Sequence, residues 1–271
     1  MRLFVTGLGG YLGHALAAAA RTEVAGTIRT RPAPPGTYGL LIDVRDEEGL
    51  RGALADFRAQ AVVHTAYVHA GDEMRSVNVD GSAAVARAAR ALAVRLVHVS
   101  SDLVFPGDAG RPLREHDAPA PVTEYGASKA DAEEAVAAAD PDAVLVRTSL
   151  IYGGAQPSDH ERRALDATMT FYADEVRCPV AAGDLAAALV ELAGRADIRG
   201  PLHVAGADAV SRLEFARLIA AAHGRDPATI RGGPRPPGRP GDITLDSSRA
   251  RELLRTRVRG VREVLGGGAS R

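Results

Sequence analysis

The chain has 271 residues, of which 46% are hydrophobic and 25% charged, and its formal net charge is −1. This composition is that of a globular protein with a large core, and its charge excludes a general attraction to nucleic acid or to an anionic membrane surface. The only cysteine, Cys178, excludes an internal disulfide, and no apolar run approaches the ~20 residues of a membrane span, so we expect a cytoplasmic protein.

Short apolar runs alternate along the chain with longer alanine-rich stretches at helical spacing. The alternation predicts an α/β fold with a doubly wound parallel sheet (Rossmann) and a smaller C-terminal substrate-binding lobe. We expect residues 1–150 to form an NAD(P)-binding domain to which 176–206 returns, and the rest of 151–271 to form mainly the lobe. The Gly- and Pro-rich stretch Arg231–Asp242 predicts a loop. The expected strands are Leu3–Val5, Glu23–Ile28, Leu40–Ile42, Ala61–His64, Leu96–Ser100, Ala143–Arg147 and Leu202–Val204, and the expected helices are Leu12–Ala20, Glu47–Phe57, Met74–Ala93, Tyr125–Ala139, Gly183–Ala193 and Arg212–His223.

A glycine-rich turn follows the first expected strand and opens the first expected helix. Its sequence is Thr6-Gly7-Leu8-Gly9-Gly10-Tyr11-Leu12-Gly13. Glycines spaced in this way allow a tight turn and a close approach of the backbone to a pyrophosphate, which the helix N-terminus attracts. The placement between strand and helix makes the pattern specific for a dinucleotide cofactor. We expect Gly7, Gly9, Gly10, Tyr11, Leu12 and Gly13 to bind it.

The end of the second expected strand is basic rather than acidic, because it reads Arg29-Thr30-Arg31. An acidic residue there would bind the ribose 2′-hydroxyl of NAD, whereas arginine suits the 2′-phosphate of NADP. We therefore expect NADP(H) rather than NAD(H), although both arginines could simply be solvated. Asp43 and Val44 follow the third strand, where Asp43 could lie near the adenine or could be a turn residue.

Polar residues follow the fourth and fifth expected strands. Parallel sheets bind ligands beyond the carboxyl ends of their strands, so Thr65, Ala66 and Tyr67 are expected to line the cofactor crevice together with Ser100. The histidines that flank this segment, His64 and His69, could line the site or could be satisfied by the backbone.

The chain contains one lysine, Lys129, four residues after Tyr125 in an expected helix. Positions i and i+4 share a helix face, so the ammonium group should approach the phenol and lower its pKa from about 10. Ser101, at the end of the fifth strand, completes a Ser/Tyr/Lys trio. Such a trio suits hydride transfer to a carbonyl, because the cofactor carries the hydride and the protein supplies one proton and polarises the C=O bond. We expect Ser101, Tyr125 and Lys129 to be catalytic, with Tyr125 and Lys129 also contacting the cofactor.

These motifs resemble the extended short-chain dehydrogenase/reductase superfamily, and within it the dTDP-4-dehydrorhamnose reductases and related sugar-nucleotide reductases. Ser100–Phe105 resembles that family's S-T-D-Y-V-F, and Arg147–Gly153 resembles its R-T-S-W-V-Y-G beside the nicotinamide. The resemblance covers nearly the whole chain. It implies NADPH-dependent reduction of a keto group on a nucleotide-linked deoxysugar. We also expect substrate contacts from Asp102, Val104 and Arg239, whose guanidinium group suits a diphosphate, and a possible homodimer.

The chain departs from this family in the half that would shape the sugar pocket. Leu103 replaces an aromatic residue, Leu150 replaces a tryptophan, and Asp174-Glu175 stands where the family usually has Asp-Gln in a segment, 154–180, that is shorter here. Arg239 could equally be solvated. The departures leave the hydride chemistry intact but put dehydrorhamnose itself in doubt.

Two other functions remain open. A sugar-nucleotide epimerase or dehydratase would recycle a tightly held NAD, and a dehydratase would carry Asp-Glu where this chain has Asp102-Leu103. A non-catalytic, NADP-binding regulatory subunit would resemble that of methionine adenosyltransferase, but the intact trio weighs against it. No His, Cys, Asp or Glu spacing resembles a zinc site, and the basic runs lack the interleaved aromatics of a single-stranded nucleic acid binder.

Overall fold

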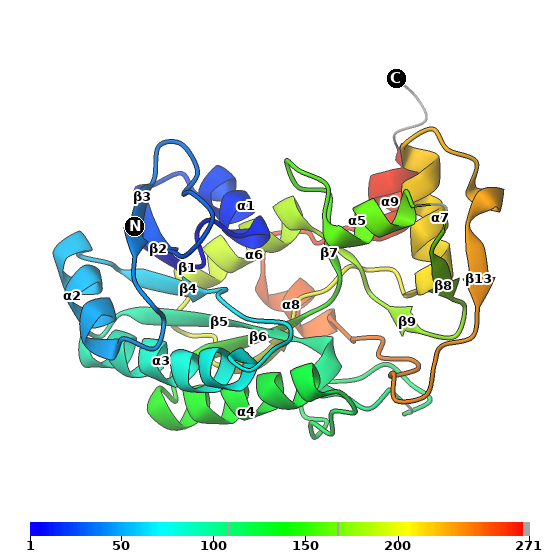
Figure 1. The fold of residues 1–271 in the computed structure, drawn as a ribbon. Helices are drawn as coiled ribbons and strands as arrows, with labels where there is room; N and C mark the ends of the chain where they lie inside the picture. Colours follow the sequence, from blue (N-terminus) through cyan, green and yellow to red (C-terminus); the bar gives the residue numbers. More distant parts are fainter. Residues whose placement is uncertain (108, 167, 268–271) are drawn as a thin grey trace.

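The computed structural model of the protein describes residues 1–107, 109–166 and 168–267. Its centre is a seven-stranded sheet in the order β11-β6-β5-β4-β1-β2-β3, in which all neighbouring strands are parallel (Figure 1). The predicted doubly wound sheet is therefore confirmed. The strands are β1 (Leu3–Thr6), β2 (Val24–Ile28), β3 (Tyr38–Leu41), β4 (Ala61–His64), β5 (Arg95–Ser101), β6 (Val144–Thr148) and β11 (Gly200–His203).

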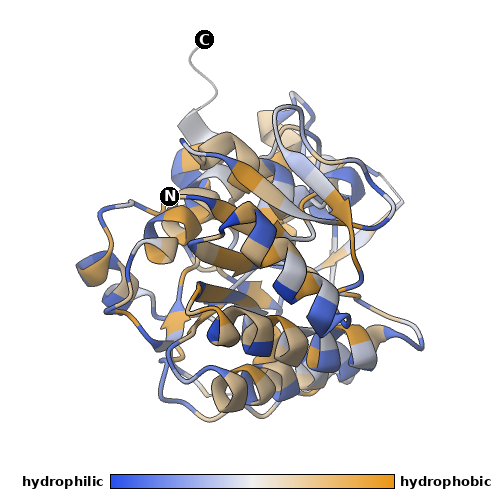
Figure 2. Cartoon of the chain, turned by 90° about the vertical axis from the view of Figure 1, so that its left-hand side faces the viewer, coloured by the Kyte–Doolittle hydropathy of each residue, from blue (hydrophilic) through white to orange (hydrophobic). Residues whose placement is uncertain are grey.

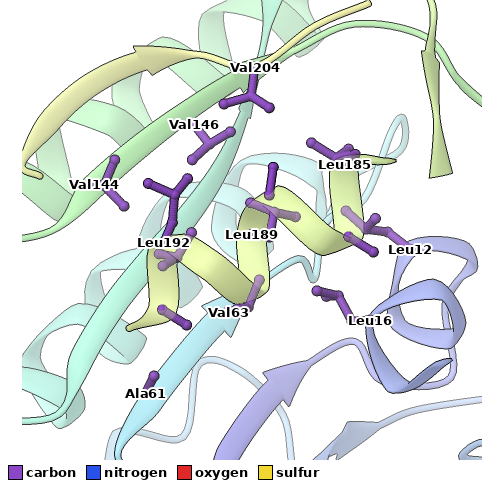
Figure 3. Close-up of a cluster of buried hydrophobic side chains, with 14 of the residues drawn as sticks. Leu12, Leu16, Ala61, Val63, Val144, Val146, Leu185, Leu189, Leu192 and Val204 are labelled. Atoms are coloured by element: carbon purple, nitrogen blue, oxygen red, sulfur yellow. The ribbon is translucent and has the colours of Figure 1, made fainter. Parts of the chain in front are cut away.

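Helices cover both faces of the sheet. Helices α1 (Tyr11–Ala19) and α6 (Ala182–Ala193) pack on one face, and α2 (Glu47–Phe57), α3 (Gly81–Ala91) and α4 (Glu124–Ala139) pack on the other. The inner strands are mainly apolar on both sides because helices cover both faces, whereas the edge strand β3 is largely exposed. Figure 3 shows one of the two resulting cores, where leucines of α1 and α6 meet valines of the strands. Figure 2 shows the sheet strands coloured mainly as hydrophobic, between helices that carry both colours.

The expected helix Met74–Ala93 differs from the structure at its start. Its first turn, Ser76–Asp80, is π-helical and leads directly into α3. The Asn78 side chain leaves this turn to bind the backbone of Val68, through its oxygen at 2.8 Å and its nitrogen at 2.9 Å, and also donates to Ser128 at 2.9 Å. The irregular turn thus joins the loop after β4 to helix α4.

Most of the remaining elements are short, and they lie beside the carboxyl ends of β5 and β6. They form three two-stranded pairs, β7 with β10, β9 with β12 and β8 with β13. The expected loop Arg231–Asp242 is therefore partly wrong, because its first three residues pair as a strand. The elements are β7 (Ile151–Tyr152), α5 (Asp159–Ala164), β8 (Thr170–Tyr172), β9 (Val176–Arg177), β10 (Val180–Ala181), β12 (Val210–Ser211), α7 (Arg212–Ala222), β13 (Arg231–Gly233), α8 (Ser248–Leu253) and α9 (Val261–Gly266), with 3₁₀ turns at Asp102–Val104 and Pro227–Thr229.

The elements of the later part of the chain pack in two different places. Helix α6 returns to pack on α1 and the main sheet, and β11 pairs with β6, whereas α7 and α9 pack in a separate apolar cluster around Tyr152 and Phe215. The domain boundary at residue 150 stays a prediction. Within the described residues, none of the helices has both the length and the apolar character needed to cross a membrane.

Candidate functional site

The glycine turn lies between β1 and α1, at the carboxyl edge of the sheet. Gly7 has φ +75°, and a Cβ there would lie 3.1 Å from the Cα of Ala66. At Gly13 a Cβ would lie 2.3 Å from the carbonyl oxygen of Leu8, so the helix can approach the turn only if this residue is glycine. No side chain caps the N-terminus of α1 at Gly10. Its free amides and the close-fitting glycines suit the pyrophosphate of a dinucleotide.

The basic segment after β2 lies directly against this turn. A Cβ on Gly9 would be 2.4 Å from the carbonyl oxygen of Arg31, which places Arg31 beside the pyrophosphate end of the site. Arg29 is mostly exposed and pairs with Glu73 at 3.1 Å. Thr30 is exposed between them. The segment thus presents two exposed arginine side chains, Arg29 and Arg31, next to the glycine turn.

Asp43 and Val44 follow β3 in different environments. Asp43 is exposed and accepts two hydrogen bonds from the Arg45 guanidinium, at 2.9 and 2.6 Å, and these bonds hold the pKa of its carboxyl below the ordinary value. Val44 is buried and supports Gly81 at the start of α3. The carboxylate is thus already paired with an arginine, and Val44 contributes packing.

Tyr125 and Lys129 lie on helix α4, which packs against the end of β5, where Ser101 lies. Helix α4 begins after Thr123, whose hydroxyl accepts from the Gly126 amide at 3.0 Å. A Cβ on Gly126 would lie 2.2 Å from the Leu103 carbonyl oxygen, so the first turn of α4, which carries Tyr125, lies against the turn that follows Ser101. Lys129 Nζ donates to the Val99 carbonyl at 2.8 Å, two residues before Ser101.

The Tyr125 ring is covered by two rings from the loop after β4. Tyr67 lies edge-on with its ring centroid 5.9 Å away, and His69 lies 4.6 Å away. Sequence reasoning left His69 undecided because a loop histidine carries no pattern. Burial raises the pKa of Tyr125 above its ordinary value, and the nearby Tyr67 and Asp102 raise it further. The phenol is therefore protonated at neutral pH.

The expectation that Lys129 lowers the pKa of Tyr125 is wrong for this structure. The ammonium group points to the backbone of β5, and burial lowers the pKa of Lys129 itself to about 8. His64 and His98 lie near it. Both are neutral at physiological pH, because burial lowers the pKa of His64 to about 3 and holds that of His98 well below its ordinary value. The Glu133 carboxylate raises the pKa of this lysine and so opposes part of the effect of burial.

The loop residues Thr65 and Ala66 are fastened to the glycine turn. Their amides donate to the Thr6 hydroxyl at 3.2 and 3.4 Å, and the Thr65 hydroxyl donates to the Thr6 carbonyl at 2.7 Å. The Thr6 hydroxyl in turn lies 2.5 Å from His64 Nδ1, which makes His64 a structural residue of the turn. Ser100 has a buried hydroxyl without a hydrogen-bond partner among the described residues.

Two of the expected substrate contacts are not supported. The side chains of Asp102 and Val104 are fully buried, and Arg177 binds both carboxylate oxygens of Asp102, one of them at 2.7 Å. Arg239 keeps partial exposure, but it donates to the buried Glu175 at 2.7 and 3.1 Å. The sequence carried no signal for Arg177, because it lies in a two-residue strand and meets Asp102 only through the tertiary fold.

No group of His, Cys, Asp and Glu that could hold a metal ion is present in the parts of the chain that the structure describes. Cys178 is buried, and burial raises the pKa of its thiol to about 11. The site therefore consists of a glycine turn, a hydroxyl, a phenol and an ammonium group. Such a set is chemically suited to holding a dinucleotide and donating a proton.

Comparisons with known proteins point to one family. The family model described as RmlD substrate binding domain matches residues 1–267. A dTDP-4-dehydrorhamnose reductase of Mycolicibacterium smegmatis is 33% identical over 97% of this chain and 84% of its own length, and one of Sinorhizobium fredii is 34% identical over 81% and 77%. A crystal structure of dTDP-4-dehydrorhamnose reductase from Bacillus anthracis, in complex with NADP, superposes with a TM-score of 0.82 at 22% identity, covering 98% of this chain and 97% of that one.

Proposed function

The chain belongs to the RmlD substrate binding domain family, and from this premise we propose that it reduces a keto group on a nucleotide-linked deoxysugar with NADPH. The proposal is supported by the position of Tyr125 and Lys129 on the helix that packs against the end of β5, where Ser101 lies, and by the uncapped glycine turn at the same edge of the sheet. The relatives named above are dTDP-4-dehydrorhamnose reductases, and the Bacillus anthracis structure contains NADP.

When bound, NADPH supplies the hydride that reaches the carbonyl carbon of the substrate. Tyr125 donates its proton to the oxygen that becomes an alkoxide, so that C=O becomes CH–OH. A phenol whose pKa is raised by burial is protonated at neutral pH, as this direction of reaction requires. Ser101 donates a hydrogen bond to the same oxygen, and Lys129 holds the cofactor ribose.

Arg29 and Arg31 select NADPH over NADH through its 2′-phosphate. Their positions support this role, since Arg31 lies against the glycine turn and Arg29 is exposed after β2. The cofactor crevice also includes Thr65, Ala66 and Tyr67.

We further propose that the enzyme acts in the cytoplasm as a homodimer. A lone, buried cysteine is compatible with a reducing compartment. Dimers with two-fold symmetry are the commonest oligomers, and the edge strand β3 exposes the large hydrophobic side chain of Leu41. Light scattering on the purified chain tests the dimer, and a monomer would refute it.

The direct test is NADPH oxidation with a panel of dTDP-linked 4-keto-6-deoxy sugars, with NADH as the alternative cofactor. We expect turnover with at least one sugar and a preference for NADPH. NADPH binding without turnover on the whole panel would refute the proposal and favour a regulatory subunit. Protein that purifies with tightly bound NAD would favour an epimerase or dehydratase.

A further inference from the structure

Tyr11 connects the cofactor helix to the C-terminal part of the chain. It is the first residue of α1, and its phenol oxygen accepts a hydrogen bond from the Gly154 amide at 2.7 Å. The phenol also donates to Glu161 at 3.4 Å. A Cβ on Gly154 would lie 2.9 Å from the phenol, so a larger residue at 154 would displace the Tyr11 ring from its present position. The contact spans 143 positions of the sequence.

Glu161 organises the segment that Tyr11 reaches. Its carboxylate is buried and accepts from the Ser158 amide at 2.7 Å and from the Gly153 amide at 3.3 Å. The Ser158 hydroxyl accepts from the Glu161 amide at 3.2 Å, which completes a capping box at the start of α5. One carboxylate therefore fastens both ends of residues 153–158 and the Tyr11 phenol, through charge-assisted hydrogen bonds.

The segment of residues 153–158 connects the glycine turn to the C-terminal part of the chain. It follows β7, whose Tyr152 packs in the apolar cluster of the C-terminal part, and it rises on the same side of the sheet as α1 (Figure 1). On the other side of the contact, Tyr11 begins α1 at the uncapped turn that is expected to hold the cofactor pyrophosphate. Burial raises the pKa of Tyr11, so the phenol keeps its proton and can donate to Glu161. A movement of residues 153–158 would therefore shift Tyr11, and a movement of Tyr11 would shift residues 153–158.

We propose that Tyr11 is a positioning residue that couples the two binding events: by holding residues 153–158 against the cofactor helix, it makes NADPH and the sugar nucleotide favour each other's binding. This inference rests on the proposed function, which supplies the two ligands. Such coupling is reciprocal, because each ligand changes the affinity of the other by the same factor.

The test is the variant Tyr11→Phe, which keeps the ring against Gly154 and removes only the hydroxyl. Calorimetry measures the Kd of NADPH with and without saturating dTDP, used as the probe for the nucleotide half of the substrate. We expect dTDP to tighten NADPH binding in the parent chain, and the variant to lose about 2- to 10-fold of this effect, the range of one hydrogen bond. Tyr38→Phe, an exposed tyrosine on β3, is the matched control and should keep the effect.

Amide hydrogen exchange supplies a readout that needs no ligand. We expect the amides of Gly153, Gly154 and Ser158 to exchange faster in Tyr11→Phe and in Glu161→Gln, while those of α6 are unchanged. The double variant should exchange no faster than Glu161→Gln alone, because both changes break the same connection.

The outcomes separate this inference from the proposed function. If the parent chain reduces a sugar nucleotide but Tyr11→Phe keeps full coupling and unchanged exchange, the coupling role of Tyr11 is wrong and the reductase stands. If the parent chain reduces no sugar nucleotide, the reductase fails, and dTDP that leaves NADPH affinity unchanged in the parent chain then overturns the coupling as well. Faster exchange with unaltered coupling would reduce Tyr11 to a structural contact and overturn the inference.

Discussion

The central sheet and the C-terminal part are held together by different interactions. Leucines and valines that are fully buried fill both faces of the sheet, and each such side chain contributes about 1.5–3 kcal/mol. The C-terminal part has strands of two or three residues, which are held by its own apolar cluster around Tyr152 and Phe215 and by ion pairs with at least one buried partner, such as Asp102–Arg177 and Glu175–Arg239. The groups proposed for hydride transfer thus lie on the framework of the central sheet, whereas Arg239, expected to contact the substrate, lies in the C-terminal part.

The sharpest test of this division removes the proton donor from the framework side. Tyr125→Phe should lower kcat by about 10²- to 10⁴-fold, because no other positioned acid replaces the phenol. The Kd of NADPH, followed by its fluorescence in a chain without tryptophan, should change little. Tyr38→Phe serves as the control with the same chemical change at an exposed position. Full activity of Tyr125→Phe would refute the catalytic role.

A second test breaks the ion pair on which the C-terminal part depends. Arg177→Met should lower the free energy of unfolding by about 3–5 kcal/mol, since it leaves the buried Asp102 carboxylate without a partner. Arg75→Met removes an exposed pair with Asp131 and should cost no more than about 1 kcal/mol. Urea unfolding measures both. Equal losses in the two variants would contradict the difference between the two regions.

The third test concerns cofactor preference and the basic segment that follows β2. The double variant Arg29→Ala/Arg31→Ala should raise the Kd of NADPH by about 10- to 100-fold, the value of losing one or two charge-assisted hydrogen bonds to a phosphate. The Kd of NADH should be unaffected. Arg51→Ala, exposed on α2, is the control. An equal effect on both cofactors would show that these arginines do not contact the 2′-phosphate.

The smallest expected effect is that of pH on Lys129. Because burial lowers the pKa of this lysine to about 8, kcat/KM of the free enzyme should fall above pH 8, by about tenfold per unit. Stability should move the other way. Between pH 8 and the unfolded pKa of about 10.4, the unfolded chain holds the proton that the folded chain has released, so the free energy of unfolding rises with pH.

Below pH 8 both states carry the charge, and the cost of burying it is fully present. Lys129→Met removes the titrating group, so it should abolish the rise in stability between pH 8 and 10.4 in urea unfolding. An unchanged pH dependence in this variant would assign the effect to another group.

The regular half of the molecule was largely predictable. Seven apolar runs became the seven strands of the sheet, and the spacing of Gly7, Gly10 and Gly13 marked the turn before α1, because strand and helix periods and glycine geometry are local properties. The irregular half was not. The strand β13 was expected as a loop, since Gly and Pro dominate its neighbourhood and only its partner β8 makes it a strand.

The catalytic trio shows where prediction stops within one site. The sequence spacing was sufficient to place Tyr125 and Lys129 on one helix after a strand that ends in Ser101. It was not sufficient to give the direction of the ammonium group, which bonds to Val99, or to show that His69 covers the phenol. The first depends on how α4 packs against β5, and the second on the course of the loop after β4.

By itself, the amino-acid sequence determined the class of fold, the order of the strands and helices of the central sheet and the position of the glycine turn, and it singled out the groups proposed to react. Only the tertiary structure decided that Arg177 seals Asp102, that Glu175 takes Arg239 and that Tyr11 reaches Gly154. The physical reason is the range of the interactions. Periodicity and turn geometry act between residues a few positions apart, whereas these contacts join residues 64 to 143 positions apart and form only once the sheet has brought them together.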